Sequence, residues 1–124
     1  MKETIISEEL LPANFKYPKE FLWLLERKVG ELTPWILLES EFIIKRYNSL
    51  KERYPARHLF PFAYRQDCDE LACWDLNDSL KIKVIEDYSR ANPAEDVVYN
   101  NFWDWFRTAI EDMIEFSKND ISYE

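Results

Sequence analysis

The segment from His58 to Leu76 constrains the fold of this chain more than any other stretch. It holds two short apolar runs, Leu59–Tyr64 and Asp69–Asp75, separated by the polar connection Arg65-Gln66-Asp67-Cys68. Runs of this length, rich in aromatic and aliphatic residues, predict two β-strands. The connection contains no glycine, which argues against a two-residue type I′ turn. Because the connection is short, antiparallel pairing of the two strands is favoured.

Periodicity along the rest of the chain predicts the remaining elements. The expected strands are Trp35–Glu39 and Lys81–Tyr88, with a short extended segment at Val97–Tyr99; the expected helices are Pro18–Val29, Glu41–Tyr54 and Asn101–Ser117. The expected helix-boundary residues are Gly30, Ser40, and Asn100 or Asn101. The last helix has a broad apolar face, which must pack on something wide, such as a sheet. This order predicts an α+β fold, an antiparallel sheet packed by N-terminal and C-terminal helices, in one domain over residues 1–124.

The helix predicted at Glu41–Tyr54 has the one basic face that the sequence predicts. Its apolar stripe consists of Ile43, Tyr47, Leu50 and Tyr54, and its outer face carries Lys45, Arg46, Lys51, Glu52 and Arg53. Nucleic-acid platforms interleave basic residues with aromatic side chains, and this face lacks that interleaving. We therefore interpret it as a solvated helix face.

Negative charge is concentrated in the second half of the chain. The formal net charge is −8 from 24 acidic and 16 basic residues; residues 1–63 hold nine acids and ten bases, which leaves fifteen acids and six bases for residues 64–124. An acidic field repels phosphate backbones, so a direct nucleic-acid partner is not expected. The same field would steer a basic protein toward this half, or would serve solubility alone.

Two groups of acidic residues are the candidate site. Asp67, Asp69, Glu70, Asp75 and Asp78 surround the predicted hairpin, and Asp104, Glu111 and Asp112 lie on the last predicted helix. Asp69 and Asp75 could share one strand face, and paired carboxylates can serve glycoside hydrolysis or bind magnesium. Successive side chains of a strand point to opposite faces, which opposes both a catalytic pair and a magnesium site. Acidic loops are usually solvated or face a partner. We expect no catalytic residue, no metal site and no cofactor.

The remaining reactive side chains form no recognisable set. His58 is the single histidine, and Cys68 and Cys73 do not have the spacing of a zinc or redox motif. No N-terminal secretory signal and no apolar run of membrane-spanning length stands out. We therefore expect two free thiols, a cytoplasmic location and no membrane contact.

Several short motifs, taken in order, resemble the SUKH superfamily, which includes bacterial toxin-immunity proteins and fungal cell-wall assembly regulators. The matching segments are Leu11-Pro12 with Phe21-Leu22, the run His58–Ala63, the acid-terminated strand Glu70–Asp75, the strand Lys83–Asp87, and Asn101-Phe102 leading into Phe106 and Ile110. The similarity covers nearly the whole chain, and its weight lies in the collective order of these motifs.

The resemblance implies a non-enzymatic binding protein, and many family members are taken to neutralise a cognate toxin, frequently a nuclease, by binding it. The acidic charge pattern is compatible with a basic toxin domain as partner. The expected contact residues are the two acidic groups defined above. The alternatives are a regulatory or scaffold domain that binds a peptide or a housekeeping protein, a homodimer that uses exposed tryptophans, and a small enzyme that uses the hairpin carboxylates.

Overall fold

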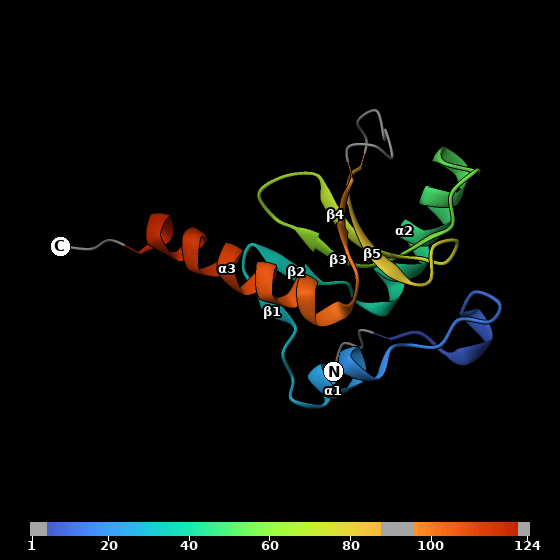
Figure 1. Ribbon diagram of the computed structural model, residues 1–124, viewed down its shortest axis with the longest axis horizontal. Helices are drawn as coiled ribbons and strands as arrows, with labels where there is room; N and C mark the ends of the chain where they lie inside the picture. The colour runs from blue at the N-terminus through green and yellow to red at the C-terminus, as the bar shows by residue number, and fades with distance from the viewer. Residues whose placement is uncertain (1–4, 88–95, 122–124) are drawn as a thin grey trace.

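The computed structural model describes residues 5–87 and 96–121, which form a six-stranded antiparallel sheet with helices on both sides (Figure 1). The strands are β1 (Glu31–Leu32), β2 (Trp35–Leu37), β3 (Leu59–Arg65), β4 (Glu70–Asp75), β5 (Lys81–Glu86) and β6 (Val97–Tyr99), and they lie in the sheet in chain order. The helices are the short 3₁₀ helix η1 (Glu8–Leu10), α1 (Lys19–Glu26), α2 (Ser40–Arg53) and α3 (Phe102–Asp120). The predicted α+β class is confirmed.

The predicted antiparallel pairing of the central strands is confirmed, but β3 and β4 are buried on both faces rather than on alternate residues. β3 pairs with β4 from Leu59–Asp75 to Tyr64–Leu71, and β4 pairs with β5 from Glu70–Glu86 to Asp75–Lys81. The β3–β4 register shifts between Pro61 and Ala63, so Phe62 occupies a β-bulge. β1 was not predicted, because a two-residue strand has no periodicity to detect.

Three predicted helix boundaries are wrong, and one of them is the end of the last helix, which is predicted at Ser117 and lies at Asp120. The first helix was expected to run to Val29 with Gly30 as its stop, but α1 ends at Glu26. Lys28 takes the left-handed conformation there, at φ 59°, and its N–H donates to the Leu25 carbonyl. Ser40 is the first residue of α2 rather than its cap; Glu39 holds the cap position without a side-chain hydrogen bond.

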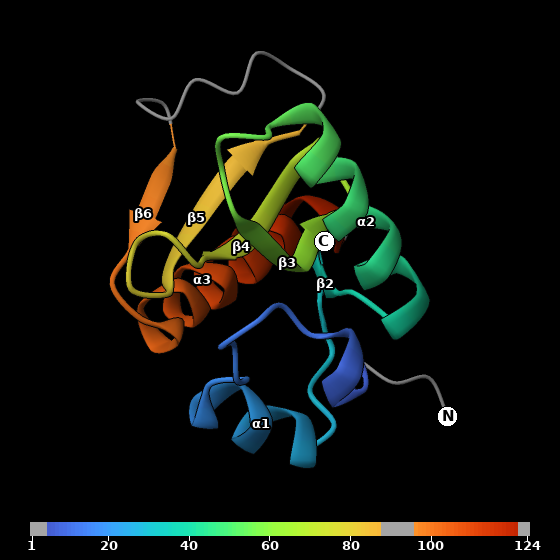
Figure 2. The same cartoon turned by 90° about the vertical axis from the view of Figure 1, so that its right-hand side faces the viewer.

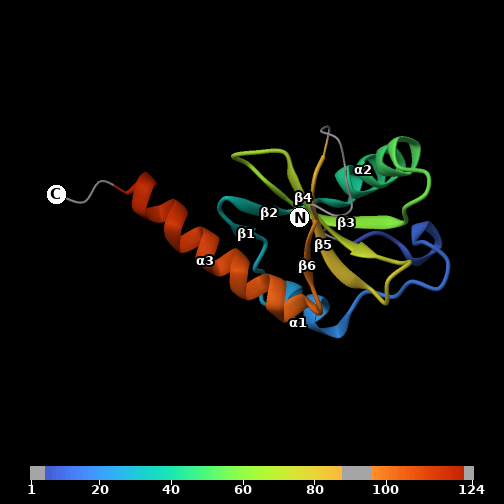
Figure 3. The same ribbon diagram turned by 45° about the horizontal axis from the view of Figure 1, so that its top comes forward.

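The last helix begins as predicted. The Asn101 side-chain oxygen accepts the Asp104 N–H at 3.0 Å, which satisfies one of the free donors of the first turn. α3 then crosses one side of the sheet, while α2 packs against β3 on the other side (Figure 3). α1 lies beside the start of α3, as the second view shows (Figure 2).

An aromatic core joins the sheet to α1 and α3. The Phe62 ring stacks on Trp74 with centroids 4.4 Å apart and meets the Trp105 ring edge-on at 4.9 Å. Phe21 of α1 touches Trp74 and Phe102 at 5.0 and 5.6 Å. All five side chains are at most 3% exposed. Aromatic pairs in these geometries contribute about 0.5–1.5 kcal/mol each beyond the area they bury.

The predicted solvated basic face of α2 is partly wrong. Ile43 and Leu50 are buried as expected, but Arg46 and Arg53 turn toward the sheet. Arg46 Nη1 lies 2.8 Å from Asp87 Oδ2, and Arg53 Nη2 donates to Asp87 Oδ1. Asp87 is only 1% exposed, so these contacts form a buried ion-pair cluster that fastens α2 to the end of β5.

Candidate functional site

Acidic side chains from two distant parts of the sequence meet around Arg65, the last residue of β3. Arg65 donates two hydrogen bonds of 2.9 Å to the Asp67 carboxylate, and its Nη1 lies 3.5 Å from both Glu70 Oε1 and Asp112 Oδ2. Asp112 comes from α3, and it also accepts a 2.9 Å hydrogen bond from Trp35 Nε1. We call Arg65, Asp67, Glu70 and Asp112 the Arg65 junction.

The electrostatics of the Arg65 junction follow from these contacts. The two-pronged hydrogen bond from Arg65 lowers the pKa of Asp67, and the same bond raises the pKa of Arg65. Three carboxylates therefore share one guanidinium, which leaves this end of the molecule acidic. The Arg65 and Asp67 side chains are 21% and 36% exposed, so water and a partner surface can both reach them.

Asp75 and Asp78 lie at the other end of β4 and form a separate cluster. Asp75 is 8% exposed; its Oδ1 accepts the Asn77 N–H at 2.9 Å and its Oδ2 lies 3.3 Å from Lys83 Nζ. Asp78 Oδ2 lies 3.0 Å from the same Lys83 nitrogen. Burial opposes the charge on Lys83, but the two carboxylates outweigh it and raise the Lys83 pKa, while Lys83 lowers the pKa of Asp78.

The predicted hairpin group is therefore not one cluster. Asp67, Asp69 and Glu70 lie at the β3–β4 turn, whereas Asp75 and Asp78 lie at the β4–β5 turn and brace it through Lys83. The sequence distance between them spans β4 itself, and a strand extends by about 3.3 Å per residue. Residues close in sequence lie far apart in space when an extended strand separates them, which is why these acids do not form one group.

The remaining predicted contact residues are on the surface. Asp69, Asp104 and Glu111 are exposed, and Asp104 lies in the first turn of α3, where a negative charge is favourable. Asp112 joins the hairpin acids at the Arg65 junction, so the structure brings part of the α3 group and part of the hairpin group together. Asp104 lies two helical turns before Asp112.

Asp69 and Asp75, the pair of carboxylates considered for glycoside hydrolysis, do not have the separation that this reaction needs. Asp69 and Asp75 stand at opposite ends of β4, about 20 Å apart along an extended strand. The two classes of glycosidase need carboxyl separations of roughly 5–5.5 Å or 6.5–9.5 Å. Within residues 5–87 and 96–121, no group of three or more histidine, cysteine or acidic residues could hold a metal ion.

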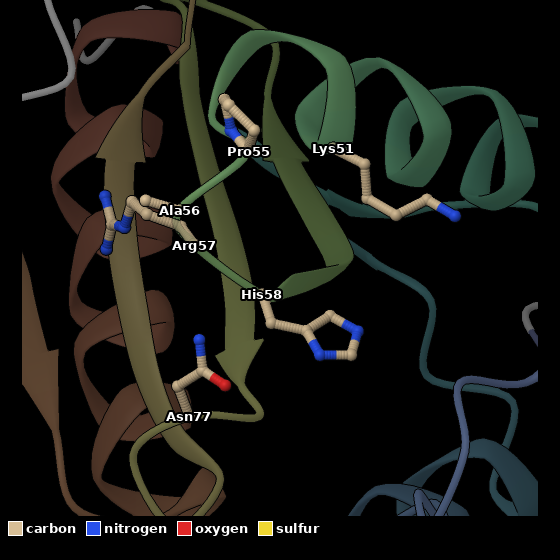
Figure 4. Close-up of a pocket in the computed structure, with 6 residues that line it drawn as sticks. All are labelled: Lys51, Pro55, Ala56, Arg57, His58 and Asn77. Atoms are coloured by element: carbon tan, nitrogen blue, oxygen red, sulfur yellow. The ribbon is translucent and has the colours of Figure 1, made fainter.

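The single histidine borders a shallow hollow of about 370 Å³ (Figure 4). The hollow is lined by Lys51, Pro55, Ala56, Arg57, His58 and Asn77. His58 Nε2 lies 2.8 Å from the Tyr47 hydroxyl, and Arg57 pairs with Asp96. In Figure 4 the Arg57 and His58 side chains point in different directions, so the basic groups do not converge on one point.

The two thiols have different surroundings. Cys68 is exposed at the β3–β4 turn, and Cys73 is fully buried in β4. Burial raises the pKa of both, and raises that of Cys73 far more. Both cysteines are free, as predicted.

The chain matches no known protein-family profile, no curated protein and no solved structure. In the described part of the chain, no helix has the length and apolar character needed to cross a membrane. The fold and the surface chemistry therefore provide the structural basis for a functional hypothesis.

Proposed function

We propose that this chain is a non-enzymatic protein-binding module that neutralises a basic toxin domain, such as a nuclease, by covering part of its surface. The observation that supports this proposal is the convergence of β3–β4 hairpin acids and α3 at the Arg65 junction. A surface of this kind supplies complementary potential to a basic partner, and such potential raises the association rate and fixes orientation.

The surroundings of the junction suit recognition better than fold maintenance. Asp69, beside Asp67, is exposed, and the Asp67 carboxylate is more than a third exposed. Exposed ion pairs contribute only about 0–1 kcal/mol to stability. Substitution of the acidic residues at this end should therefore alter binding with little loss of stability. This is expected of a surface that faces a partner.

The test is capture of a partner from the native cell by the immobilised chain, followed by identification and assay. We expect a basic protein to be retained at low salt and released at high salt, because screening weakens attraction between exposed charges. The purified partner should be toxic or enzymatically active alone and inactive in the presence of the chain. A partner that keeps its full activity when bound would contradict neutralisation.

A charge-matched pair of variants isolates the contribution of the surface. The double variant Asp69→Lys, Glu70→Lys should slow association at least tenfold and flatten its salt dependence. The control Glu8→Lys, Glu9→Lys makes the same change in net charge at adjacent exposed acids of η1, far from the junction in sequence. Equal slowing by both variants would show that net charge, rather than this surface, governs association.

A second candidate function rests on β6. β6 pairs only with β5 among the strands of residues 5–87 and 96–121, and Val97 and Val98 are each 48% exposed. An exposed edge strand can accept an extended peptide as an additional strand, which is the mode of a regulatory or scaffold domain. Capture that survives Asp69→Lys, Glu70→Lys but is lost in Val97→Lys, Val98→Lys would favour this alternative.

A further inference from the structure

The C-terminal half of α3 extends beyond the sheet. The helix has 19 residues, and Figures 1 and 3 show its last turns projecting away from the strands. Burial follows the same division: Phe102, Trp105 and Ala109 are buried, and none of the residues from 110 to 121 is. We call residues 113–121 the α3 overhang.

Apolar residues continue along the helix into the α3 overhang, which the sheet does not cover. Phe116 follows Trp105 by eleven residues, which is three helical turns, so both lie on one face. Trp105 is 1% exposed, whereas Phe116 is only partly covered and lies outside the buried core and the residues packed against it. Ile114 and Ile121 are 47% and 52% exposed. A helix end that contacts only water would carry polar residues at these positions.

The position of the α3 overhang connects it with the Arg65 junction. Asp112 holds α3 to Arg65, the last residue of β3, and to Trp35, the first residue of β2. Phe116 is one turn further along the same face, so it follows directly after this anchor. Apolar side chains are thus bordered on one side by the junction acids, in the arrangement of an apolar interface centre with a charged rim.

The charge of this region identifies the kind of occupant. From residue 110 to residue 121, α3 carries Glu111, Asp112, Glu115, Lys118 and Asp120, a net charge of −3. A second copy of the chain would place the same negative charge opposite, and like charges across an interface cost several kcal/mol. A positively charged partner has no such cost. Because Met113 and Phe116 are three residues apart and so share one face of the helix, a second amphipathic helix is the natural complement.

We propose that the α3 overhang docks a basic amphipathic helix, with Met113 and Phe116 as the apolar contacts and Asp112 and Asp120 as the acidic groups beside them. This inference rests on the proposed function and specifies where and in what form the basic partner binds. Met113 packs partly on the core and so holds the root of the α3 overhang in place.

Two synthetic 18-residue peptides test the proposal. Both carry leucine along one face of the helix. The first peptide has lysine at all remaining positions, and the second has glutamate at those positions. We expect the full-length chain to bind the lysine peptide in fluorescence anisotropy and to bind the glutamate peptide at least tenfold more weakly. Equal binding of the two peptides, or no binding of the lysine peptide, would overturn the proposal.

Matched variants locate the binding surface. Phe116→Ser should weaken binding of the lysine peptide at least tenfold, with thermal unfolding unchanged, since Phe116 does not belong to the core. The control Ile114→Ser removes an apolar side chain that is 47% exposed and lies on another side of the same helix. An equal loss in the control would overturn the proposal by showing unspecific apolar binding. If sedimentation analysis shows that the wild type is a dimer and that Phe116→Ser is a monomer, the surface binds a second copy of the chain and the proposal is overturned.

The outcome can be separated from that of the proposed function. If Asp69→Lys, Glu70→Lys weakens capture of a natural partner but Phe116→Ser captures it as well as the wild type does, the docking proposal fails and the proposed function stands. If the lysine peptide binds the α3 overhang but no neutralised partner exists, the docking surface stands and the toxin-binding function fails.

Discussion

Two acid–base clusters in this protein use the same chemistry in opposite surroundings. At the end of β5, Asp87 is 1% exposed and receives Arg46 and Arg53 from α2. At the end of β3, Arg65 gathers three carboxylates whose side chains are about 28–36% exposed. Burial removes water from the Asp87 carboxylate, although Arg46 and Arg53 are 29% and 27% exposed, whereas all three carboxylates around Arg65 remain in contact with water. The first cluster therefore holds the fold together, and the second has charge available for a partner.

The largest effect is expected from Asp87→Ala. This substitution leaves two arginines beside the sheet without the carboxylate that they share, and removing one partner of a buried ion pair costs about 3–5 kcal/mol. Urea denaturation of the variant and of the wild type measures the loss. The control Asp69→Ala removes an exposed carboxylate and should change stability by less than about 0.5 kcal/mol. If Asp87→Ala costs no more than this control, the cluster is solvent-screened and the comparison fails.

An intermediate effect is expected from Asp75→Ala. Asp75 is 8% exposed and binds both the Asn77 N–H and Lys83, so its loss removes the brace of the β4–β5 turn. Leaving such groups without their acceptor costs about 1–3 kcal/mol. Thermal or urea unfolding measures the change. Asp87→Ala should remain the more damaging of the two; the reverse order would mean that the turn, rather than the α2 cluster, limits stability.

The smallest effect concerns the pH dependence of the Arg65–Asp67 pair. Arg65 lowers the pKa of Asp67 in the folded state, whereas an unfolded aspartate titrates near 3.9. The pair therefore stabilises the fold above about pH 4, and this contribution is lost as the pH falls through the lowered folded pKa. Water screens the pair, which limits the effect to less than about 1 kcal/mol.

Asp67→Asn provides the measurement for this pair. The variant should be slightly less stable than the wild type at pH 7, and urea denaturation at stepwise lower pH should show the difference shrinking toward zero below about pH 4. A difference that persists undiminished at pH 2 would show that Asp67 stabilises by its shape or neutral hydrogen bonds, and the role given to its charge would be wrong.

Local patterns predicted the fold well because most of the fold is local. The alternation in Lys81–Glu86 and the apolar face beginning at Phe102 specify a strand and a helix without reference to the rest of the chain. The boundary errors at Lys28 and Ser40 arose where residues other than the preferred glycine or serine took the special backbone positions. Tertiary context overrode the local preference there.

The clusters were beyond the reach of sequence reasoning for a physical reason. Arg46 and Asp87 are 41 residues apart, so only the completed sheet brings them together. A signal did exist: Arg46 and Arg53 are seven residues apart, which places them on one side of α2 beside the buried stripe. That spacing indicates that both arginines face the same part of the protein, but it does not identify Asp87 as the residue that they contact. Arg65 and Asp112 likewise meet only because α3 crosses the end of β3.

The strand order of the sheet also has a consequence for how the chain folds. Every strand neighbours the strand that precedes it in the sequence, so β3, β4 and β5 can form by successive hairpin closures with a small entropic cost. α3, in contrast, contacts β1 and β2 as well as β5 and β6. It can complete these contacts only when both ends of the sheet are in place, because long-range contacts follow loop closure. We expect the strands to pair in sequence first and α3 to dock late, when it contacts the strands at both ends of the sheet.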